Sequence, residues 1–264
     1  MRTVKVVQIN IYKGRYLESL ADFLIREKPD LVTLQEVSSG KVNLFSDTSI
    51  NLFEYLKEKI GLFGFFSQDQ KLKEDANSKF GNAVFSRWPI KSTKVLILKK
   101  FRPLTLEEFG NSKYWPYVTR TLINAVISLN SKTVHLMSWH GAWTAPPTET
   151  AENIRQAGLV ADYLELLNKN NQSFILGGDL NMPPKTKVID MINSVSNNLM
   201  INSPFEYTTH PKIHKIVPRK LLVDYIFTSH HFKVLSLYVP EVTVSDHLPV
   251  VAELELMENS PLFW

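Results

Sequence analysis

Short runs of β-branched and aromatic residues recur along the whole chain, and most are shorter than a typical helix. Most runs are bounded by Gly, Pro or Asn, which favour turns. Runs of this kind are typical of β-strands. The sequence therefore predicts strands near residues 4–9, 31–34, 81–86, 93–98, 118–129, 133–138, 174–176, 223–227, 232–239 and 249–256.

Helical patterns are scattered among these strands. Apolar residues at positions 17, 20, 21 and 24 lie on one helix face, and Pro29 ends the pattern. Similar patterns predict helices at 52–60, 149–167 and 187–195. Because no linker or change in composition divides the chain, we expect one α/β domain over residues 1–264. Two sheets packed face to face with helices outside, or one large mixed sheet, both accommodate so many strands.

The composition limits the classes of partner and of metal site. Of the 264 residues, 44% are hydrophobic, so the chain can bury a sizeable core. A net charge of +4 and a pI near 9.0 tilt weakly towards anionic partners such as nucleic acid or phosphate esters. Cysteine is absent, which excludes disulfides and zinc–thiolate sites. Any metal must be held by oxygen or imidazole, which favours a hard cation.

The N-terminal residues lack the long apolar segment of a signal peptide. No apolar run approaches the roughly 20 residues that a membrane span requires. We therefore expect a soluble, cytoplasmic protein without a membrane span, with a monomer as the default oligomeric state.

Polar residues follow several predicted strands at the point where each strand ends. They are Asn10, Glu36, His140, Asp179, Asn181, Asp224, Asp246 and His247. Strand ends at one edge of a sheet converge, and buried polar groups there need partners or a metal to offset lost hydration. Carboxylate and amide oxygens predict an oxygen-rich site for Mg²⁺ or a similar cation. Two histidines beside it can donate to the same phosphate.

Each of these residues also has a purely structural interpretation. Asn10 and Glu36 could be helix caps or turn formers, and His140 could be a core histidine between two tryptophans. The two glycines before Asp179 let the backbone approach a ligand closely. A double-glycine turn capped by an aspartate is nevertheless an ordinary structure.

Asp224 is the hardest of the set to explain as a structural residue. It lies in an apolar run, and an unpaired buried carboxylate is costly. His247 is the candidate partner, and pairing would fix its tautomer and favour its charged form. The loop 244–249 alone favours a turn with a satisfied histidine. With Asp224 behind His247, it instead predicts a site in which Asp246 faces a cation and His247 faces a phosphate.

Two loops interleave basic with aromatic or polar residues. The first is the segment 99–117, and the second, 210–220, carries Lys212, Lys215, Arg219 and Lys220. Such loops can track a phosphate backbone and stack bases. Solvated surface loops of no specific function explain them equally well.

Eight short motifs become informative through their order. They are Asn10 after the first strand, Gln35-Glu36, Gly81-Asn82-Ala83, Arg120, His140, Gly178-Asp179-Leu180-Asn181, Asp224-Tyr225-Ile226 and Ser245-Asp246-His247. Over nearly the whole chain this set resembles the endonuclease/exonuclease/phosphatase superfamily of deoxyribonuclease I-like enzymes, in the form of a small stand-alone member. The resemblance implies a four-layer α/β/β/α sandwich of two mixed β-sheets flanked by helices, with the site at one edge of the sheets.

The resemblance also implies a set of metal ligands. Glu36 would be the principal ligand of Mg²⁺ or Mn²⁺, with Asn10 and Asp246 in or near the metal shell. Several nucleases of the superfamily carry an aspartate two residues after the first-strand asparagine. Here that position is Tyr12, which argues against a second metal arrangement that uses it.

Catalytic roles follow from the same resemblance. Asp179 would orient or deprotonate the attacking water, steadied by Asn181. The scissile phosphate would be held by His140 and by His247, with Asp224 paired to the latter. These groups would stabilise the charge that builds on the phosphate oxygens.

The expected function is divalent-metal-dependent hydrolysis of a phosphate ester. The net positive charge and the first basic–aromatic loop favour a nuclease acting on DNA or RNA, with Arg120 and Asn82 implied as substrate-binding residues. A phosphatase or phosphodiesterase for a small-molecule or lipid-derived phosphate is the first alternative. A catalytically silent member that binds nucleic acid or protein is the second, and Tyr12 supports it.

Overall fold

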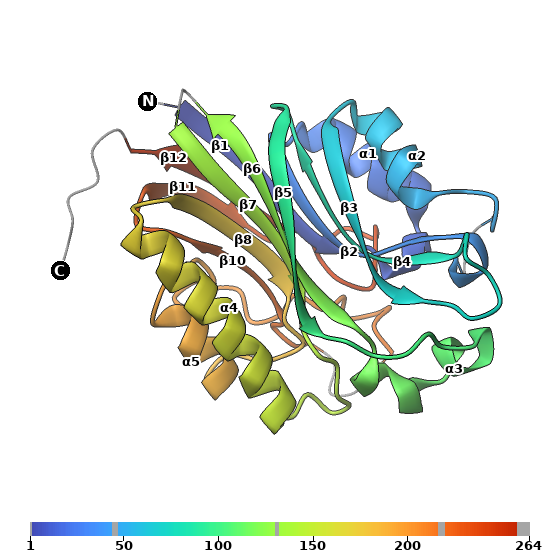
Figure 1. The fold of residues 1–264 in the computed structure, drawn as a ribbon. Coiled ribbons are helices and arrows are strands. Elements are labelled where there is room, and N and C mark those ends of the chain that lie inside the picture. The colour runs from blue at the N-terminus through green and yellow to red at the C-terminus, as the bar shows by residue number, and fades with distance from the viewer. Residues whose placement is uncertain (1, 44–46, 130–131, 216–219, 258–264) are drawn as a thin grey trace.

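Two six-stranded β-sheets packed face to face form the centre of the molecule (Figure 1). The computed structural model describes residues 2–43, 47–129, 132–215 and 220–257. Arg219 of the second predicted basic loop therefore lies outside the described residues. The other residues named above in the sequence-based predictions are described.

The first sheet has the N-terminal strand near its centre. Its order is β11-β12-β1-β2-β4-β3. β1 and β2 run parallel, and the other neighbouring pairs are antiparallel. The strands are β11 (Phe232–Tyr238), β12 (Val250–Leu256), β1 (Arg2–Asn10), β2 (Leu31–Ser39), β4 (Lys79–Ser86) and β3 (Phe63–Lys71).

The second sheet has the order β5-β6-β7-β8-β10-β9. β7 and β8 run parallel, and the other neighbours are antiparallel. The strands are β5 (Ile90–Lys99), β6 (Arg120–Leu129), β7 (Lys132–His140), β8 (Ser173–Asp179), β10 (Asp224–Thr228) and β9 (Asn197–Asn198). Each sheet is therefore mixed, with one parallel pair at its centre.

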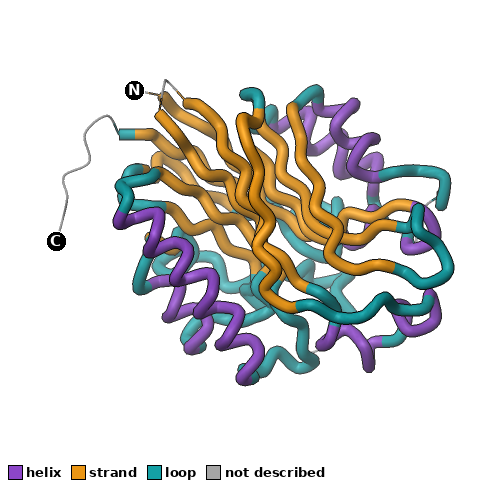
Figure 2. Tube along the Cα trace, in the orientation of Figure 1, coloured by secondary structure: helices purple, strands orange, loops and turns teal. Residues whose placement is uncertain are grey.

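Helices cover the outer face of each sheet (Figures 1 and 2). α1 (Leu17–Glu27) and α2 (Leu52–Ile60) cover the first sheet, and α4 (Ala151–Lys169) and α5 (Lys187–Asn193) cover the second. The remaining helical turns lie in loops and are η1 (Tyr12–Gly14), η2 (Gly40–Val42), α3 (Leu106–Gly110) and η3 (Ser112–Tyr117). The predicted four-layer α/β/β/α sandwich is confirmed. None of the described helices is long and apolar enough to cross a membrane.

The space between the sheets changes from apolar to polar along the strands. In β1, Val4 and Val6 pack between the sheets, whereas Val7 packs under α1 and α2. Because side chains alternate along a strand, Gln8 and Asn10 continue the inward row of Val4 and Val6. The C-terminal ends of the central strands therefore bring polar groups into the gap between the sheets.

A layer of buried hydrogen bonds joins the two sheets at this polar end. The side-chain amides of Gln8 and Gln35 exchange hydrogen bonds, and Thr33 Oγ1 donates to Gln8 Oε1 at 2.6 Å. Gln35 Nε2 donates to Ser138 Oγ of the second sheet at 3.0 Å. Gln8 Nε2 lies 3.4 Å from Asp224 Oδ1. Since buried polar groups need partners, this layer favours one relative position of the sheets.

Gly177 lets the sheets approach closely at this layer. A Cβ atom at Gly177 would lie 2.1 Å from Thr33 Oγ1 and 3.0 Å from Gln8 Oε1. The sequence interpretation assigned the glycines before Asp179 to the approach of a ligand. At Gly177 the close neighbour is instead the opposite sheet.

We expect Gly177→Ala to lower the free energy of unfolding by about 3 kcal/mol, because the added methyl group overpacks the polar layer. Gly158→Ala is the matched control, since its Cβ would meet only Met191 Cε at 3.4 Å and Gly158 lies inside α4. That control should stabilise the helix by up to ~1 kcal/mol. Urea unfolding of both variants measures the difference. Equal stability of Gly177→Ala and the unsubstituted protein would contradict the close approach.

Most predicted strands and helices are present, but β3, α3 and the two-residue strand β9 were not predicted. The second half of β3 is polar, and Ser67, Asp69 and Gln70 are nevertheless buried. They are buried because they are hydrogen-bonded, as in the bond from Gln70 Nε2 to Arg102 O at 2.9 Å. Such a strand lacks the apolar alternation by which strands are recognised. The helix predicted to reach residue 195 ends at Asn193.

Candidate active site

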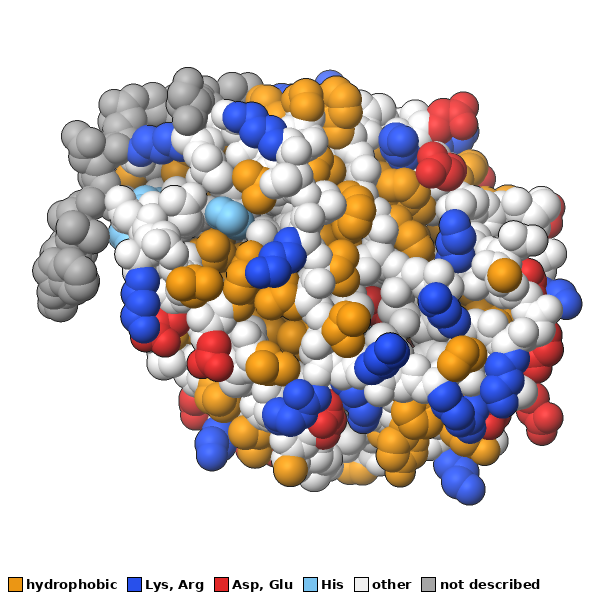
Figure 3. All heavy atoms as spheres, in the orientation of Figure 1, with side chains coloured by type: hydrophobic (Ala, Val, Ile, Leu, Met, Phe, Trp, Pro, Cys, Tyr) orange, Lys and Arg blue, Asp and Glu red, His pale blue; other side chains and the backbone are white. Residues whose placement is uncertain are grey.

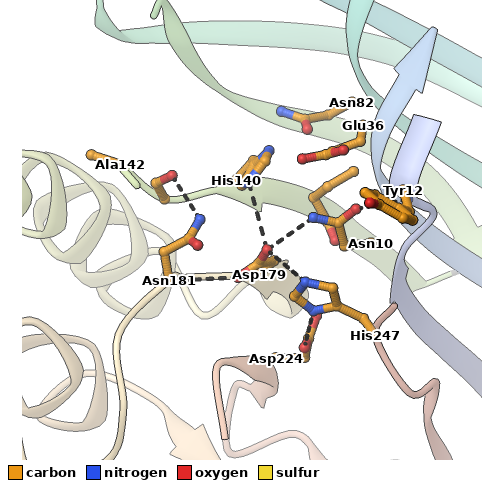
Figure 4. A network of polar contacts seen from close by, with 12 residues as sticks. Asn10, Tyr12, Glu36, Asn82, His140, Ala142, Asp179, Asn181, Asp224 and His247 are labelled. Carbon is orange, nitrogen blue, oxygen red and sulfur yellow. Dashed lines mark hydrogen bonds and ion pairs between the residues drawn. The ribbon is translucent and has the colours of Figure 1, made fainter. Parts of the chain in front are cut away.

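A cavity of about 210 Å³ lies at the polar end of the two sheets. Its walls include the predicted residues Asn10, Glu36, Arg120, His140, Asp179, Asn181, Asp246 and His247. Asp224 contacts Nδ1 of His247 (Figure 4). Asn82 does not line the cavity, and its Nδ2 atom donates to Asp69 Oδ2 at 2.9 Å. The structure thus brings the predicted residues together, with Asn82 at the periphery.

The strand register places Asp179 at the centre of the site. In the second sheet, Asp179 at the end of β8 pairs with His140 on β7 and with Asp224 on β10. From the first sheet, Asn10 Nδ2 at the end of β1 donates to Asp179 Oδ2 at 3.0 Å. The C-terminal ends of the parallel pairs therefore meet at one carboxylate, as expected for strands that end at one edge.

Asp179 is buried, and its two carboxylate oxygens have different partners. Oδ1 accepts the backbone N–H of Asn181 at 2.9 Å, where Asn181 adopts a left-handed φ of 54°. The Nε2 atoms of His140 and His247 lie 3.6 and 3.8 Å from Oδ2. Burial raises the pKa of Asp179 to about 7, with the charge of His247 opposing and that of Asp224 adding to the shift. A carboxylate with this pKa suits proton transfer near neutral pH.

His247 is held in its charged form. Its Nδ1 atom lies 2.7 Å from Oδ2 of the fully buried Asp224, so the structure contains the pair that the buried carboxylate suggested. Because a carboxylate only accepts, Nδ1 carries a hydrogen. Burial alone would lower the pKa of His247, but the charges of Asp224 and Asp179 outweigh burial and hold that pKa well above its ordinary value. The Nε2–H group is then a charged donor in the cavity.

His140 is held in the opposite state. Arg120 Nη1 lies 3.2 Å from His140 Nδ1. A guanidinium has only donors, so Nδ1 must accept and Nε2 carries the hydrogen. Burial lowers the pKa of His140 well below its ordinary value, and the charges of Arg120 and His247 lower it further. A neutral donor and a charged donor therefore lie on two sides of Asp179 Oδ2.

Asp69 is a buried acid that the sequence analysis missed. It lies at a bulge of β3, and its carboxylate accepts from Asn82 Nδ2 at 2.9 Å and from Thr121 Oγ1. Burial raises the pKa of Asp69 to about 7, and the charge of Arg120 opposes that shift. Asp69 therefore supports the start of β6, which carries Arg120. A single acidic residue in a polar segment does not indicate from the sequence that it is buried and supports another strand.

Glu36 reaches the cavity from a bulge in β2. Gln35 and Glu36 together oppose one residue of β4, because the register shifts between Leu34 and Val37. Glu36 adopts a left-handed φ of 59°, which is uncommon for a residue with a side chain. Such bulges often redirect a side chain beside an active site. The Glu36 carboxylate lies 3.8 Å from the Lys13 ammonium.

The sequence profile of the endonuclease/exonuclease/phosphatase family matches residues 7–247, from β1 to His247 of this site. The chain belongs to this family. No protein with a curated description matches the chain by sequence. The family assignment agrees with the two-sheet fold and with the position of the cavity.

Solved structures share the fold of this family member at low sequence identity. A family protein from Bacteroides vulgatus has a TM-score of 0.72 and 16% identity over 97% of this chain and 100% of that chain. A mannosyl-6-phosphatase from Bacteroides thetaiotaomicron has a TM-score of 0.70 and 18% identity, over 96% and 100% of the two chains. D. rerio TDP2 complexed with a single-strand DNA product has a TM-score of 0.68 and 12% identity, over 97% and 100%. These similarities show the fold.

The donor set of this family member suits a hard divalent cation. Burial raises the pKa of Asp246 to about 6, and the negative charge of Glu36 adds to the shift. Two carboxylates that repel each other share the cavity with the side-chain oxygen of Asn10, which accepts the Tyr12 N–H at 3.0 Å and keeps a second lone pair. Carboxylate and amide oxygens are the ligands that Mg²⁺ prefers.

Among the described residues, two other groups of side chains have ligand atoms within 4.8 Å of one another. They are His214, Asp246 and His247, and Asp179, Asp224 and His247. Both depend on His247, whose Nδ1 is bound to Asp224 and which is held charged. A protonated imidazole is not a metal ligand. Glu36, Asp246 and Asn10 therefore fit a cation better than either group.

Tyr12 occupies the position at which several related nucleases carry an aspartate. Its ring lines the cavity. Burial raises the pKa of Tyr12, and the charge of Asp246 raises it further, so the phenol stays neutral near pH 7. This position therefore supplies no additional carboxylate.

The cavity also has walls that the sequence analysis did not assign. They include Lys13, Phe80, Phe109, Trp115, Val118, Trp143, His214 and Lys215. Phe109 and Trp115 lie in the first predicted basic–aromatic loop, and Lys215 lies in the second. The sequence did not indicate that Phe80 and Trp143 line a cavity, because an aromatic residue near a predicted strand is usually part of the core.

Proposed function

We propose that this family member hydrolyses phosphate esters in a divalent-metal-dependent reaction. The arrangement around Asp179 carries this proposal. A buried carboxylate with a pKa of about 7 lies between a charged donor, His247, and a neutral donor, His140. Two imidazole N–H groups aimed at one point suit the binding of a phosphate group.

The cation, Mg²⁺ or Mn²⁺, would be held by Glu36, Asp246 and the side-chain oxygen of Asn10. When bound, such a cation polarises the phosphoryl group and offsets charge on the leaving oxygen. The neutral phenol of Tyr12 supports a site for one cation rather than two.

Asp179 would take a proton from the attacking water. Asn10 and the backbone of Asn181 hold its two oxygens at 3.0 and 2.9 Å, so the carboxylate has a fixed orientation before the substrate binds. Fixed orientation reduces the reorganisation needed during the reaction. The expected geometry is in-line attack on phosphorus from the side of Asp179.

His247 and His140 would bind the oxygens of the phosphate as charge builds on them. Asp224 keeps His247 charged and oriented, and Arg120 keeps His140 in the tautomer with a hydrogen on Nε2. Donors that are already oriented contribute more in a buried site than in water. Arg120 also lines the cavity and adds positive charge near the phosphate.

A nuclease acting on DNA or RNA and a phosphatase for a small phosphate ester are the two candidates for the finer activity. Net positive charge and the cavity residues Trp115 and Lys215 favour the nuclease. The cavity volume of about 210 Å³ suits a small substrate. On the face shown in Figure 3 the Lys and Arg side chains are dispersed and form no continuous basic track. Related folds include a mannosyl-6-phosphatase and a protein bound to DNA.

Salt dependence separates these two candidates. For a nuclease we expect log kcat/KM to fall with log salt concentration with a slope of about −0.9 per phosphate contacted on duplex DNA. For a small phosphomonoester, the slope should be much shallower. Steady-state rates at several NaCl concentrations measure it.

A substrate panel tests the proposed function itself. We expect hydrolysis of at least one class among single- and double-stranded DNA, abasic DNA, RNA, sugar phosphates and aryl phosphates, with Mg²⁺ or Mn²⁺. Chelation with EDTA should abolish it and added metal should restore it. Absence of hydrolysis in every class, or equal rates in EDTA, would contradict the proposal. Ligand binding without hydrolysis would instead indicate the catalytically silent alternative.

A further inference from the structure

The cavity has an aromatic wall that the proposed mechanism does not use. We define this wall as Phe80 of β4, Phe109 of α3, Trp115 of η3 and Trp143 of the segment after β7. The rings of Phe80 and Phe109 pack edge to face, with their centroids 5.0 Å apart. The rings of Trp115 and Trp143 pack in the same way, with their centroids 5.0 Å apart. The phenylalanines are buried and the tryptophans are half-buried. Both tryptophans line the cavity, and part of their ring surface is accessible.

The aromatic wall is fixed in orientation. Trp115 Nε1 donates to the backbone oxygen of Phe109 at 2.9 Å, which ties η3 to α3. A capping box between Thr105 and Glu108 stabilises the start of α3. A ring bound against Trp115 would therefore meet a preformed surface and lose little free energy to reordering.

Lys13 connects the aromatic wall to the proposed metal ligands. Its Nζ atom lies 5.3 Å from the Trp115 ring centroid, 5.7 Å from that of Phe109 and 5.9 Å from that of Phe80. The same atom lies 3.8 Å from Glu36 Oε2. The Lys13 side chain thus contacts both the aromatic wall and Glu36, a proposed metal ligand. A group bound on the aromatic wall therefore lies in the same cavity as a phosphate held at Asp179.

The charge in the cavity restricts what the aromatic wall can bind. Aromatic rings attract cations, but Lys13 already occupies that interaction, and Arg120 and Lys215 line the same cavity. A cationic substrate group placed against these rings would lie next to the Lys13 ammonium and be repelled by it. A planar uncharged ring can stack on the tryptophans and on Lys13 at the same time. An aliphatic group would gain burial but neither stacking nor the cation–ring interaction.

We propose that the aromatic wall binds a planar aromatic ring in the ester group of the substrate. This inference rests on the proposed phosphoesterase function and names its substrate class. The ring can be a nucleobase or an aryl group, since both present the same planar face. In either case the phosphate lies at Asp179 and the ring lies against Trp115 and Trp143.

Binding of phosphonates that resist hydrolysis tests the aromatic wall without turnover. By calorimetry in Mg²⁺, we expect phenylphosphonate to bind about tenfold more tightly than methylphosphonate and several-fold more tightly than cyclohexylphosphonate. The preference should disappear in Trp115→Leu and in Trp143→Leu. It should persist in Tyr117→Leu, because Tyr117 stacks on Phe101 and does not line the cavity.

A nucleotide pair distinguishes the two sources of the ring. In Asp179→Asn, which prevents turnover, thymidine 5′-monophosphate is compared with 2′-deoxyribose 5-phosphate. Tighter binding of the nucleotide, lost on adding Trp115→Leu, would assign the wall to a nucleobase. A preference for phenylphosphonate without one for the nucleotide would assign it to an aryl group.

Three results would overturn the inference. They are equal binding of the phenyl and cyclohexyl compounds, tighter binding of phosphocholine than of phenylphosphonate, or an unchanged preference in correctly folded Trp115→Leu and Trp143→Leu. The phosphonate series on the unsubstituted protein decides the question if the variants misfold. Ring preference without hydrolysis in the substrate panel would refute only the proposed function. Hydrolysis without ring preference would refute only the proposed binding of an aromatic ring at the aromatic wall.

Discussion

Replacing Asp179 with Asn is expected to lower kcat by roughly 10³- to 10⁴-fold. The substitution keeps the shape of the side chain but removes the carboxylate that Asn10 and the backbone of Asn181 orient in the cavity. An amide cannot accept a proton from water near neutral pH. Steady-state hydrolysis of the best substrate in Mg²⁺ measures the loss.

The Asp179→Asn protein should remain folded. Burial raises the pKa of Asp179 to about 7, which means that the ionised carboxylate is costly inside the protein above that pH. A neutral amide avoids this cost but can accept only one of the two hydrogen bonds from Asn10 and Asn181, so the thermal midpoint at pH 8 should stay close to that of the unsubstituted protein. Retention of more than about a tenth of the activity in a folded variant would be inconsistent with a general base worth two or more orders of magnitude.

Loss of His247 is the second large effect that we expect. His247→Gln should lower kcat by about 10³-fold, because the amide is a neutral donor and cannot offset charge on the phosphate as an imidazolium does. Asp224→Asn should lower it by about 10²-fold, because Asp224 acts through the orientation and charge of His247. Kinetics of the two single variants and of the double variant measure these losses.

The double variant decides whether the two residues act as one unit. If they do, Asp224→Asn should add little to the loss already caused by His247→Gln. His231→Gln is the control, since His231 is also buried but bonds to Ser229 and Asn171 away from the cavity. Its activity should be unchanged. Losses that multiply in the double variant would show that Asp224 and His247 act independently.

Much of the fold could be predicted because burial leaves a periodic mark on the sequence. β1 is an example, since Val4 and Val6 on one face pack between the sheets, and Val7 and Ile9 on the other face pack under the helices. The helix predicted at 52–60 has Gly61 as its C-cap, as expected from the sequence, and the left-handed φ of 66° at Gly61 ends α2 as glycine commonly does. β3 could not be predicted in the same way. Its buried side chains are polar and are satisfied by partners that are distant in the sequence.

The site could be predicted only as far as its residues follow strands. Asp179 and His140 end neighbouring parallel strands, and that pattern is visible without coordinates. The orientation of Glu36 depends on a bulge in the pairing of β2 with β4, which no local pattern in the sequence specifies. The tautomer of His140 likewise depends on Arg120, which arrives from a different strand.

The aromatic wall shows a different limit of sequence reasoning. Phe80 and Phe109 pack in an apolar cluster and also face the cavity. A phenylalanine that serves a core and a binding site has the same sequence pattern as one that serves the core alone. Only the arrangement of the loop from Phe101 to Val118 beside β4 distinguishes the two roles.

Hydrolysis in ¹⁸O-labelled water tests the central claim most directly, because the claim is that Asp179 directs water to phosphorus. With Mg²⁺ and the best ester substrate, a single turnover should place one ¹⁸O atom in the phosphate product and none in the alcohol. EDTA and the Asp179→Asn substitution should each abolish incorporation. Label in the alcohol, or equal incorporation into phosphate by Asp179→Asn, would contradict the account.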